Sequence, residues 1–304
     1  MKRLGTVFAG LVMIGLAGFL LVTQPRPTST EVFAGLIGDP VQGELVYTAA
    51  GCGSCHMAPG ATGDAQLVLS GGQKFASPFG DFLAPNISTD PERGIGGWTL
   101  PQFATAVMDG ISPQNEHYYP AMPYLAYGKM VPQDLADLKA YMDGLPASDV
   151  ASLPHDLGFP FNIRRTLGGW KLLFQNRNFV MSGDLGAEVD RGRYIVEAMS
   201  HCGECHTPRN ILGGLKTAQW MGGAANPSGP GRIPNVTPGA LTWDAQETFA
   251  FLTTGFTPDF DSVGGSMAHV VDNLAKLPPG DVWAVVAYLQ ALPAVASDAA
   301  TAAP

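Results

Sequence analysis

Apolar residues recur at helical spacing in two stretches of the chain that lie 147 residues apart. The apolar positions follow the i, i+3, i+4 pattern of an amphipathic helix. They are Leu135, Leu138, Tyr141, Met142 and Leu145 in the first stretch and Val282, Val285, Val286, Leu289 and Leu292 in the second. Asp134 and Asp281 stand where an N-cap belongs, and Pro146 and Pro293 follow the last apolar position. The pattern predicts one helix at each place.

Two further helices are predicted upstream of each of these. The first begins at about Gly43 in one half and Gly192 in the other, and it runs into a segment that carries two cysteines. The second lies near 100–108 and 245–253, and each is followed by a glycine, as is common at a helix C-terminus. The sequence between the second and third helices is rich in proline and glycine, which predicts loop. The expected fold class is mainly α.

The same order of residues returns in the two halves. Each contains a Pro-Asn-aliphatic-Ser/Thr run, at 85–88 and 234–237, followed by a tryptophan, a glycine and a methionine at intervals of 12 residues. These residues are Trp98, Gly110 and Met122 in the first half and Trp243, Gly255 and Met267 in the second. Such an internal repeat predicts two tandem domains of one kind.

The repeat also sets the expected domain boundaries. We expect a linker at 24–38, a first domain at 39–149, a connector at 150–186, a second domain at 187–293 and a disordered tail at 294–304. The connector is aromatic and basic rather than Gly/Ser-rich, so it is expected to pack between the domains and fix their relation. An amphipathic helix that faces lipid or a partner protein is the alternative for this segment.

The N-terminus carries an uncharged apolar run at 4–22, directly after Lys2 and Arg3. About 20 helical residues span a hydrocarbon core, so the run predicts a transmembrane anchor over 1–23. The positive charges would keep this end in the cytoplasm, which predicts a protein of the bacterial inner membrane with both domains in the periplasm. A cleaved signal peptide is the alternative, with Val32-Phe33-Ala34 as a possible cleavage site.

The formal net charge of −9 is spread unevenly. Residues 35–150 carry 4 basic and 12 acidic side chains, and residues 187–293 carry 6 and 10. The connector is positive, with 4 basic side chains against 2 acidic ones in 151–186. No basic face is available to neutralise phosphates, which excludes nucleic acid as a partner.

All four cysteines lie in two pentads of the pattern Cys-x-x-Cys-His, 150 residues apart. The pentads are Cys52-Gly53-Ser54-Cys55-His56 and Cys202-Gly203-Glu204-Cys205-His206. This pattern is the attachment signature of c-type haem, in which both thiols add to haem vinyl groups and the histidine ligates the iron. It predicts two covalently bound haem c groups.

Paired cysteines also occur in three other kinds of site. Half of a zinc site, a redox dithiol or two disulfides would each use paired cysteines. None of them needs a histidine directly after the second cysteine, and this chain has one twice. Attachment of haem c takes place outside the bacterial cytoplasm, which agrees with the export predicted from the N-terminus.

Each iron then needs a second axial ligand or an open site. Methionine opposite histidine raises the reduction potential in cytochromes c. Met122 and Met267 are the methionines that occupy equivalent places in both halves, so we predict His56/Met122 and His206/Met267 ligation. His117 and His269 are the rival axial ligands, but neither has a counterpart in the other half, so both are interpreted as solvated loop residues. His155 and His201 are interpreted in the same way.

Other recurring or basic residues are candidates for contact with the haem. Trp98 and Trp243 are expected to lie in the core, to pack on a haem or to donate an indole N–H to a propionate. Arg164 and Arg165 of the connector could offset propionate charge between the haems. Arg209, which follows the second pentad, could pair with a propionate or be exposed.

The chain resembles the multihaem cytochrome c subunits of membrane-bound bacterial dehydrogenases for alcohols, gluconate and fructose. The resemblance covers about residues 39–293 and is carried by the two pentads, Ala84-Pro85-Asn86-Ile87-Ser88, Tyr119-Pro120-Ala121-Met122-Pro123-Tyr124, Phe159-Pro160-Phe161-Asn162-Ile163-Arg164 and Thr207-Pro208-Arg209-Asn210. It implies electron relay from a dehydrogenase subunit towards quinone, another cytochrome or a terminal oxidase. A third haem module is absent from this sequence, so direct quinol oxidation is not implied.

The sequence therefore predicts a membrane-anchored dihaem electron carrier rather than an enzyme, with redox proteins as its partners. Two alternatives are kept. One is a dihaem enzyme of the peroxidase or thiosulfate dehydrogenase type, which needs an open or unusual axial position. The other is a fixed electron-transfer subunit of a respiratory or photosynthetic supercomplex.

Overall fold

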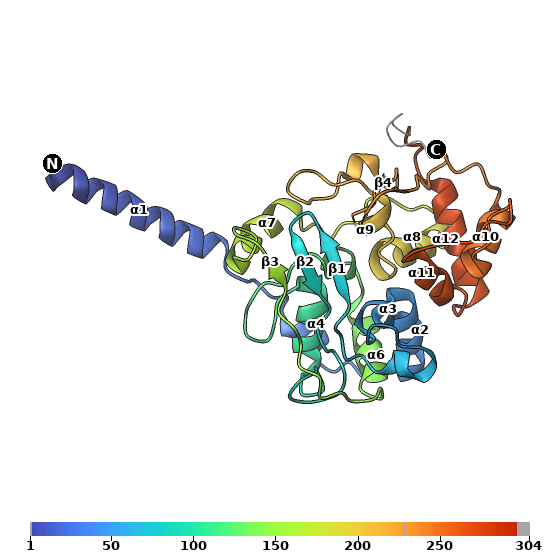
Figure 1. The fold of residues 1–304 in the computed structure, drawn as a ribbon, viewed down its shortest axis with the longest axis horizontal. Coiled ribbons are helices and arrows are strands. Elements are labelled where there is room, and N and C mark those ends of the chain that lie inside the picture. Colours follow the sequence, from blue (N-terminus) through green and yellow to red (C-terminus); the bar gives the residue numbers. More distant parts are fainter. Residues whose placement is uncertain (1, 228, 297–304) are drawn as a thin grey trace.

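The computed structural model describes residues 2–227 and 229–296, in which helices recur in the same order in two halves of the chain (Figure 1). The first half contains α2 (Pro40–Ala50), α3 (Cys52–His56), α4 (Leu100–Asp109), α5 (Tyr124–Tyr127) and α6 (Pro132–Met142). The second contains α8 (Ala187–Tyr194), a π-helical turn (Ile195–Met199), α9 (Gly203–His206), α10 (Ala245–Thr254), α11 (Met267–Leu274) and α12 (Pro279–Ala291). The mainly helical class is as predicted.

Strands are few and short. β1 (Lys74–Ser77), β2 (Gly80–Leu83) and β3 (Asp156–Leu157) form an antiparallel sheet in that order, and β4 (Ala224–Ala225) pairs with β5 (Arg232–Ile233). Single 3₁₀ turns complete the chain at Thr30–Phe33, Gly63–Leu67, Arg164–Thr166 and Thr217–Gln219. Gly80 of β2 pairs with Leu157 of β3, so the connector closes the sheet of the first half.

The N-terminal helix α1 (Lys2–Val22) projects from the rest of the molecule (Figure 1). Across the described ranges 2–227 and 229–296, no helix combines the length and the apolar character that a membrane crossing requires. The predicted transmembrane anchor over 1–23, and the inner-membrane location that depended on it, are therefore wrong.

The first and last helices of each half cross at a glycine. A Cβ atom added at Gly43 would lie 1.9 Å from the carbonyl oxygen of Asp137 on α6, and one at Gly192 would lie 1.9 Å from that of Ala284 on α12. Only glycine permits so close an approach of two helix backbones. The sequence prediction placed the helix starts at these glycines, but α2 begins at Pro40 and α8 at Ala187.

The second helix of each half has the same two ends. The side chains of Thr99 and Asp244 accept backbone hydrogen bonds in capping boxes at the starts of α4 and α10. Both helices end at a glycine in the left-handed region, Gly110 with φ 59° and Gly255 with φ 77°. The predicted second helices and their glycine ends are confirmed.

The aspartates predicted as N-caps of the last helices take a different position. α6 begins at Pro132 and α12 at Pro279, because proline is favoured in the first helical turn. Asp134 and Asp281 lie within that first turn, where a carboxylate still interacts favourably with the helix dipole. The N-cap prediction was wrong by one helical turn at most.

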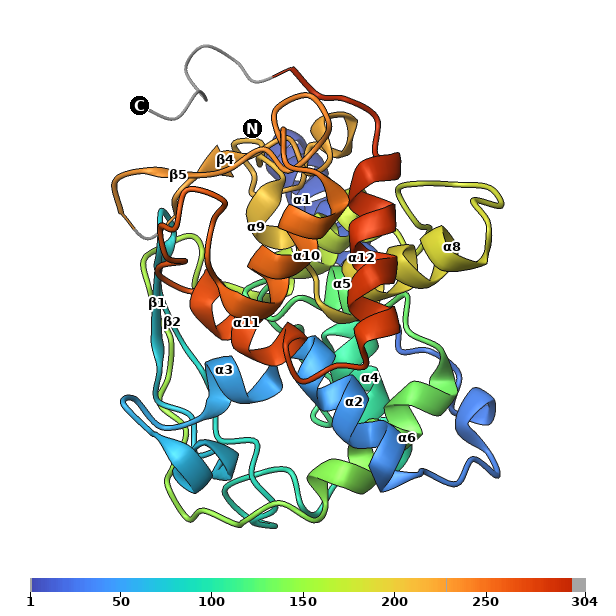
Figure 2. The same ribbon diagram turned by 90° about the vertical axis from the view of Figure 1, so that its right-hand side faces the viewer.

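The segments predicted as loop between the second and third helices contain the helices α5 and α11. All four residues of α5 are buried, and α11 buries Val271 and Leu274. α5 packs against the π-helical turn and α11 against α2, so each short helix contacts the other half of the molecule (Figure 2). Packing between the halves, rather than local pattern, stabilises them.

The connector contacts both halves. The Nζ atom of Lys171 on α7 (Leu167–Phe174) donates to the carbonyl oxygens of Asp109 (2.6 Å) and Gly110 (2.8 Å) at the end of α4. The indole N–H of Trp170 donates to the carbonyl oxygen of Leu212 in the second half, over 2.8 Å. The exact domain boundaries stay a prediction, and residues 297–304 of the predicted tail lie outside the described residues.

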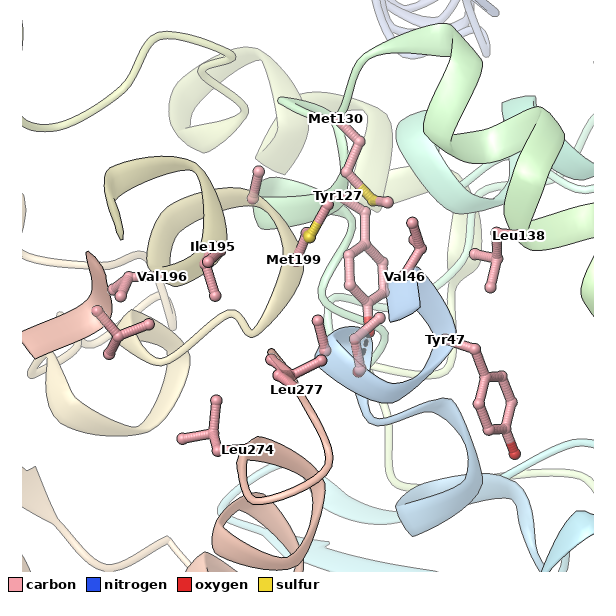
Figure 3. Packing of buried hydrophobic residues seen from close by; sticks show 14 of the residues in the cluster. Val46, Tyr47, Tyr127, Met130, Leu138, Ile195, Val196, Met199, Leu274 and Leu277 are labelled. Carbon is pink, nitrogen blue, oxygen red and sulfur yellow. Dashed lines mark hydrogen bonds between the residues drawn. The ribbon is translucent and has the colours of Figure 1, made fainter. Parts of the chain in front are cut away.

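Buried apolar side chains of both halves form one continuous cluster. At its centre, Tyr127 of α5 lies between Val46 of α2 and Met199 of the π-helical turn, with Leu277 close by (Figure 3). The two halves thus share a core.

Candidate haem-attachment sites

Each pentad forms a short helix directly after a longer one. In the first half α2 ends at Gly51, whose φ of 65° turns the chain into α3. In the second half the turn before the pentad falls at His201, whose φ of 44° is unusual for a residue with a side chain. Both turns place two cysteines and a histidine on a single helical turn.

The two pentad histidines are oriented by the same contact. Nδ1 of His56 lies 2.9 Å from the carbonyl oxygen of Pro85, and Nδ1 of His206 lies 2.8 Å from that of Pro234. A carbonyl oxygen only accepts, so Nδ1 carries the proton and the lone pair of Nε2 is left for a metal. Burial lowers the pKa of both histidines, against the opposing effect of these carbonyls, which favours the neutral imidazole that ligates iron.

The prolines are themselves held by the asparagine that follows each. The side-chain amide of Asn86 donates to the carbonyl oxygens of Ser148 and Val150, both over 2.8 Å. That of Asn235 donates to Val295 over 2.8 Å. The Pro-Asn run recognised in the sequence therefore ties the histidine to the segment after the last helix of its own half. The repeat was visible in the sequence, but its role in aiming the histidine was not.

The four cysteines are free thiols; Cys52, Cys55 and Cys202 are partly buried, and Cys205 is exposed. Desolvation raises the pKa of Cys52 and Cys202 to about 12, and desolvation together with the nearby Cys205 raises that of Cys55 to about 11. No group of three or more His, Cys, Asp or Glu side chains that could hold a metal ion occurs among the described residues.

The two methionines predicted as iron ligands lie at corresponding places. Met122 is in the turn before α5, where its N–H donates to Tyr119 over 3.2 Å. Met267 is the first residue of α11, rather than part of a loop as the sequence suggested. Both are partly buried against the core. Their role on the iron stays a prediction.

The other histidines have different surroundings from those expected. His117 is buried, with Nε2 at 2.9 Å from the carbonyl oxygen of Thr23, and His155 Nδ1 accepts the N–H of Leu83 over 3.1 Å. Neither is a solvated loop residue, because each supports a backbone group. His269 is exposed.

The tryptophans predicted to lie near the haem are both partly buried. Trp98 packs against the buried cluster. The ring centroid of Trp243 lies 5.1 Å from that of Phe251, and its side chain lines a cavity of about 290 Å³ together with Val236 and Leu289. Contact of either tryptophan with a haem stays a prediction.

The three arginines predicted to offset propionate charge all hydrogen-bond to protein groups. Arg164 donates to the carbonyl oxygen of His117 over 3.3 Å, and Nε of Arg165 donates to the hydroxyl of Thr23 over 3.0 Å. Arg209 pairs with Glu204 of the second pentad. Their contact with propionates stays a prediction.

Comparison with known proteins identifies the class. Residues 41–146 match the Cytochrome c family model. The chain is 51% identical over 295 residues to a protein of Cereibacter sphaeroides described as "Diheme cytochrome c-type", covering 97% of this chain and 100% of that protein. It is 35% identical over 296 residues to the fructose dehydrogenase cytochrome subunit of Gluconobacter japonicus, and 30% identical over 264 residues to the gluconate 2-dehydrogenase cytochrome c subunit of Pantoea cypripedii. The aligned regions cover 95% and 83% of this chain and 59% of each of those subunits.

The chain therefore belongs to the dihaem c-type cytochromes, and the resemblance to dehydrogenase cytochrome subunits is confirmed. It carries two covalently bound haem c groups. The residues present fit this cofactor, since each half offers two unpaired thiols and a neutral histidine with a free Nε2. Electron transfer is the activity that this family implies.

Proposed function

We propose that this protein relays electrons from a partner oxidoreductase, such as a dehydrogenase, to a downstream acceptor that is a quinone, another cytochrome or an oxidase. The observation that carries the proposal is that both halves hold the pentad histidine in the same way. A proline carbonyl fixes the tautomer of His56 in the first half and of His206 in the second, which leaves Nε2 of each for iron. The names of the relatives support it, because several are cytochrome subunits of dehydrogenases.

The chain contributes position and environment rather than substrate chemistry. Bound haem supplies reversible one-electron storage. His56 and His206 would hold the iron from one side, and we assign Met122 and Met267 to the other. Ligands held by a packed core limit rearrangement when the charge on the site changes, which favours transfer over activation of a substrate.

The proposal is tested on the fully loaded protein. It should be reduced by the dehydrogenase that co-purifies with it and reoxidised by a quinone analogue or a soluble cytochrome. Carbon monoxide should not bind to the ferrous protein without denaturant, because both axial positions would be filled. Carbon monoxide binding would favour the alternative of a dihaem enzyme with an open site.

The acidic surface should select among small redox reagents. With a net charge of −9, the protein is expected to react faster with a cationic one-electron reductant than with an anionic one of equal driving force, by about tenfold at low ionic strength. The advantage should shrink as salt screens the charges. Stopped-flow reduction rates at 10 and 300 mM salt, where the screening length is about 30 Å and about 6 Å, measure this. Equal rates for both reagents at low salt would contradict it.

A further inference from the structure

The segments that carry the two pentads meet directly. The carbonyl oxygen of Ala50, two residues before Cys52, accepts the hydroxyl of Tyr127 over 2.9 Å. The ring of His201, the residue immediately before Cys202, stands edge-on to the Tyr127 ring, with centroids 5.7 Å apart at 80°. Tyr127 thus links the approach to the first pentad with the approach to the second.

A second bond joins the halves within the first pentad. The side-chain amide of Asn273 on α11 donates to the hydroxyl of Ser54 over 3.1 Å. Ser54 lies between the two cysteines of the first pentad, and α11 begins at Met267. The helix assigned to the iron of the second half therefore reaches the attachment turn of the first half (Figure 2).

The backbone at this junction is specialised. His201 adopts a left-handed φ of 44°, which is unfavourable for a non-glycine residue. Tyr127 is 8% exposed and lies at the centre of the shared core (Figure 3). A strained residue persists where its surroundings over-determine it, and here the Tyr127 ring packs edge-on against the His201 ring.

We propose that Tyr127, His201 and Asn273 are positioning residues that set the separation of the two haems by locking one attachment segment onto the other. The proposal rests on the relay function and deepens it, since a fixed separation makes electron exchange between the two sites fast and uniform. None of the three residues needs to touch a cofactor for this role.

Two variants test the junction without removing apolar volume. Tyr127→Phe combined with Asn273→Ala deletes both donors, and His201→Asn keeps a residue that tolerates the left-handed region while removing the ring. Tyr119→Phe is the matched control, because it deletes a similar hydroxyl bond, to the Phe161 carbonyl at 2.9 Å, away from the junction.

The first readout is the distance distribution between the two ferric haems, measured by pulsed electron paramagnetic resonance on the loaded full-length protein. Wild type and Tyr119→Phe are expected to give one narrow distance, and the two junction variants a longer and broader one. The second readout is the rate of electron exchange between the haems after flash reduction, which should fall in the junction variants at unchanged reduction potentials.

The possible results distinguish a failure of the junction proposal from a failure of the relay function. Junction variants with the distance distribution and exchange rate of wild type would overturn the proposal. A wild-type protein whose haems never exchange electrons would instead count against the relay, while the distances would still test the junction. If the double variant does not fold, Asn273→Ala alone and His201→Asn carry the test.

Discussion

Replacing Glu197 with alanine is expected to lower the free energy of unfolding by about 3–5 kcal/mol, because it leaves a buried charge without its partner. The Glu197 side chain is 0% exposed and lies 3.1 Å from Nζ of Lys129, which is itself 7% exposed. The carboxylate also accepts the Tyr288 hydroxyl over 2.7 Å and the N–H groups of Val180 (2.5 Å) and Met181 (3.1 Å).

These partners come from three parts of the chain, so loss of the carboxylate should weaken contacts in both halves and in the connector. Lys129 follows α5 in the first half, Val180 and Met181 lie in the connector, and Tyr288 lies on α12 in the second half. Removing the carboxylate leaves the Lys129 ammonium, the Tyr288 hydroxyl proton and two amide N–H groups without their acceptor, although the Tyr288 oxygen still accepts the indole N–H of Trp220. Each buried donor without an acceptor is costly. Urea unfolding of the loaded protein, followed by circular dichroism, should show a lower midpoint.

Two comparisons make the result specific. Glu188→Ala removes an exposed acidic residue of the neighbouring helix α8 and should shift stability by no more than about 0.5 kcal/mol. Combining Lys129→Met with Glu197→Gln should restore much of the loss, since no charge then remains buried. A Glu197→Ala protein that unfolds at the wild-type urea concentration would show that the pair does not support the fold.

Features encoded by local pattern could be predicted from the sequence. The helices around residues 100 and 245 were recovered with their glycine ends, because a capping box and a left-handed glycine act within a few residues. The pentads were found for the same reason, since the thiols and the histidine lie on one turn. The duplicated order of residues then extended each local assignment to the other half.

Features that depend on distant partners could not be predicted. Glu197 stands in the apolar run Ile195-Val196-Glu197-Ala198-Met199, and nothing nearby in the sequence indicates that Lys129 neutralises it. The helices α5 and α11 were expected to be loop because proline and glycine dominate their surroundings. Their helical state depends on burial against the opposite half, which the local sequence does not encode.

Dependence on distant partners also explains why the roles of Gly43 and His201 were not predicted. Gly43 was interpreted as a helix start, whereas its function is to let α6 approach the backbone of α2. His201 was interpreted as a solvated loop residue because the first half has no counterpart. The absence of a counterpart is better explained by the contact of His201 with Tyr127 of the other half, since a contact between two unlike surfaces need not be duplicated.

Substituting Met122 or Met267 with alanine is expected to remove the sulfur-to-iron charge-transfer absorption of one haem and to lower the reduction potential of that haem, because thioether ligation raises the potential. Each single variant should lose about half of the absorption, and the double variant all of it, since the repeat assigns one methionine to each iron.

Met130→Leu is the matched control: Met130 lies eight residues after Met122 but is 3% exposed within the shared core, so the absorption should be unchanged. Absorption spectra of the ferric protein and a redox titration of each variant measure both effects. Retention of the full band in both single variants would exclude these methionines as ligands. Loss of the band in Met130→Leu would instead assign the iron of the first half to Met130. His117 is a weaker alternative ligand than Met130, because its Nε2 already lies 2.9 Å from the carbonyl oxygen of Thr23.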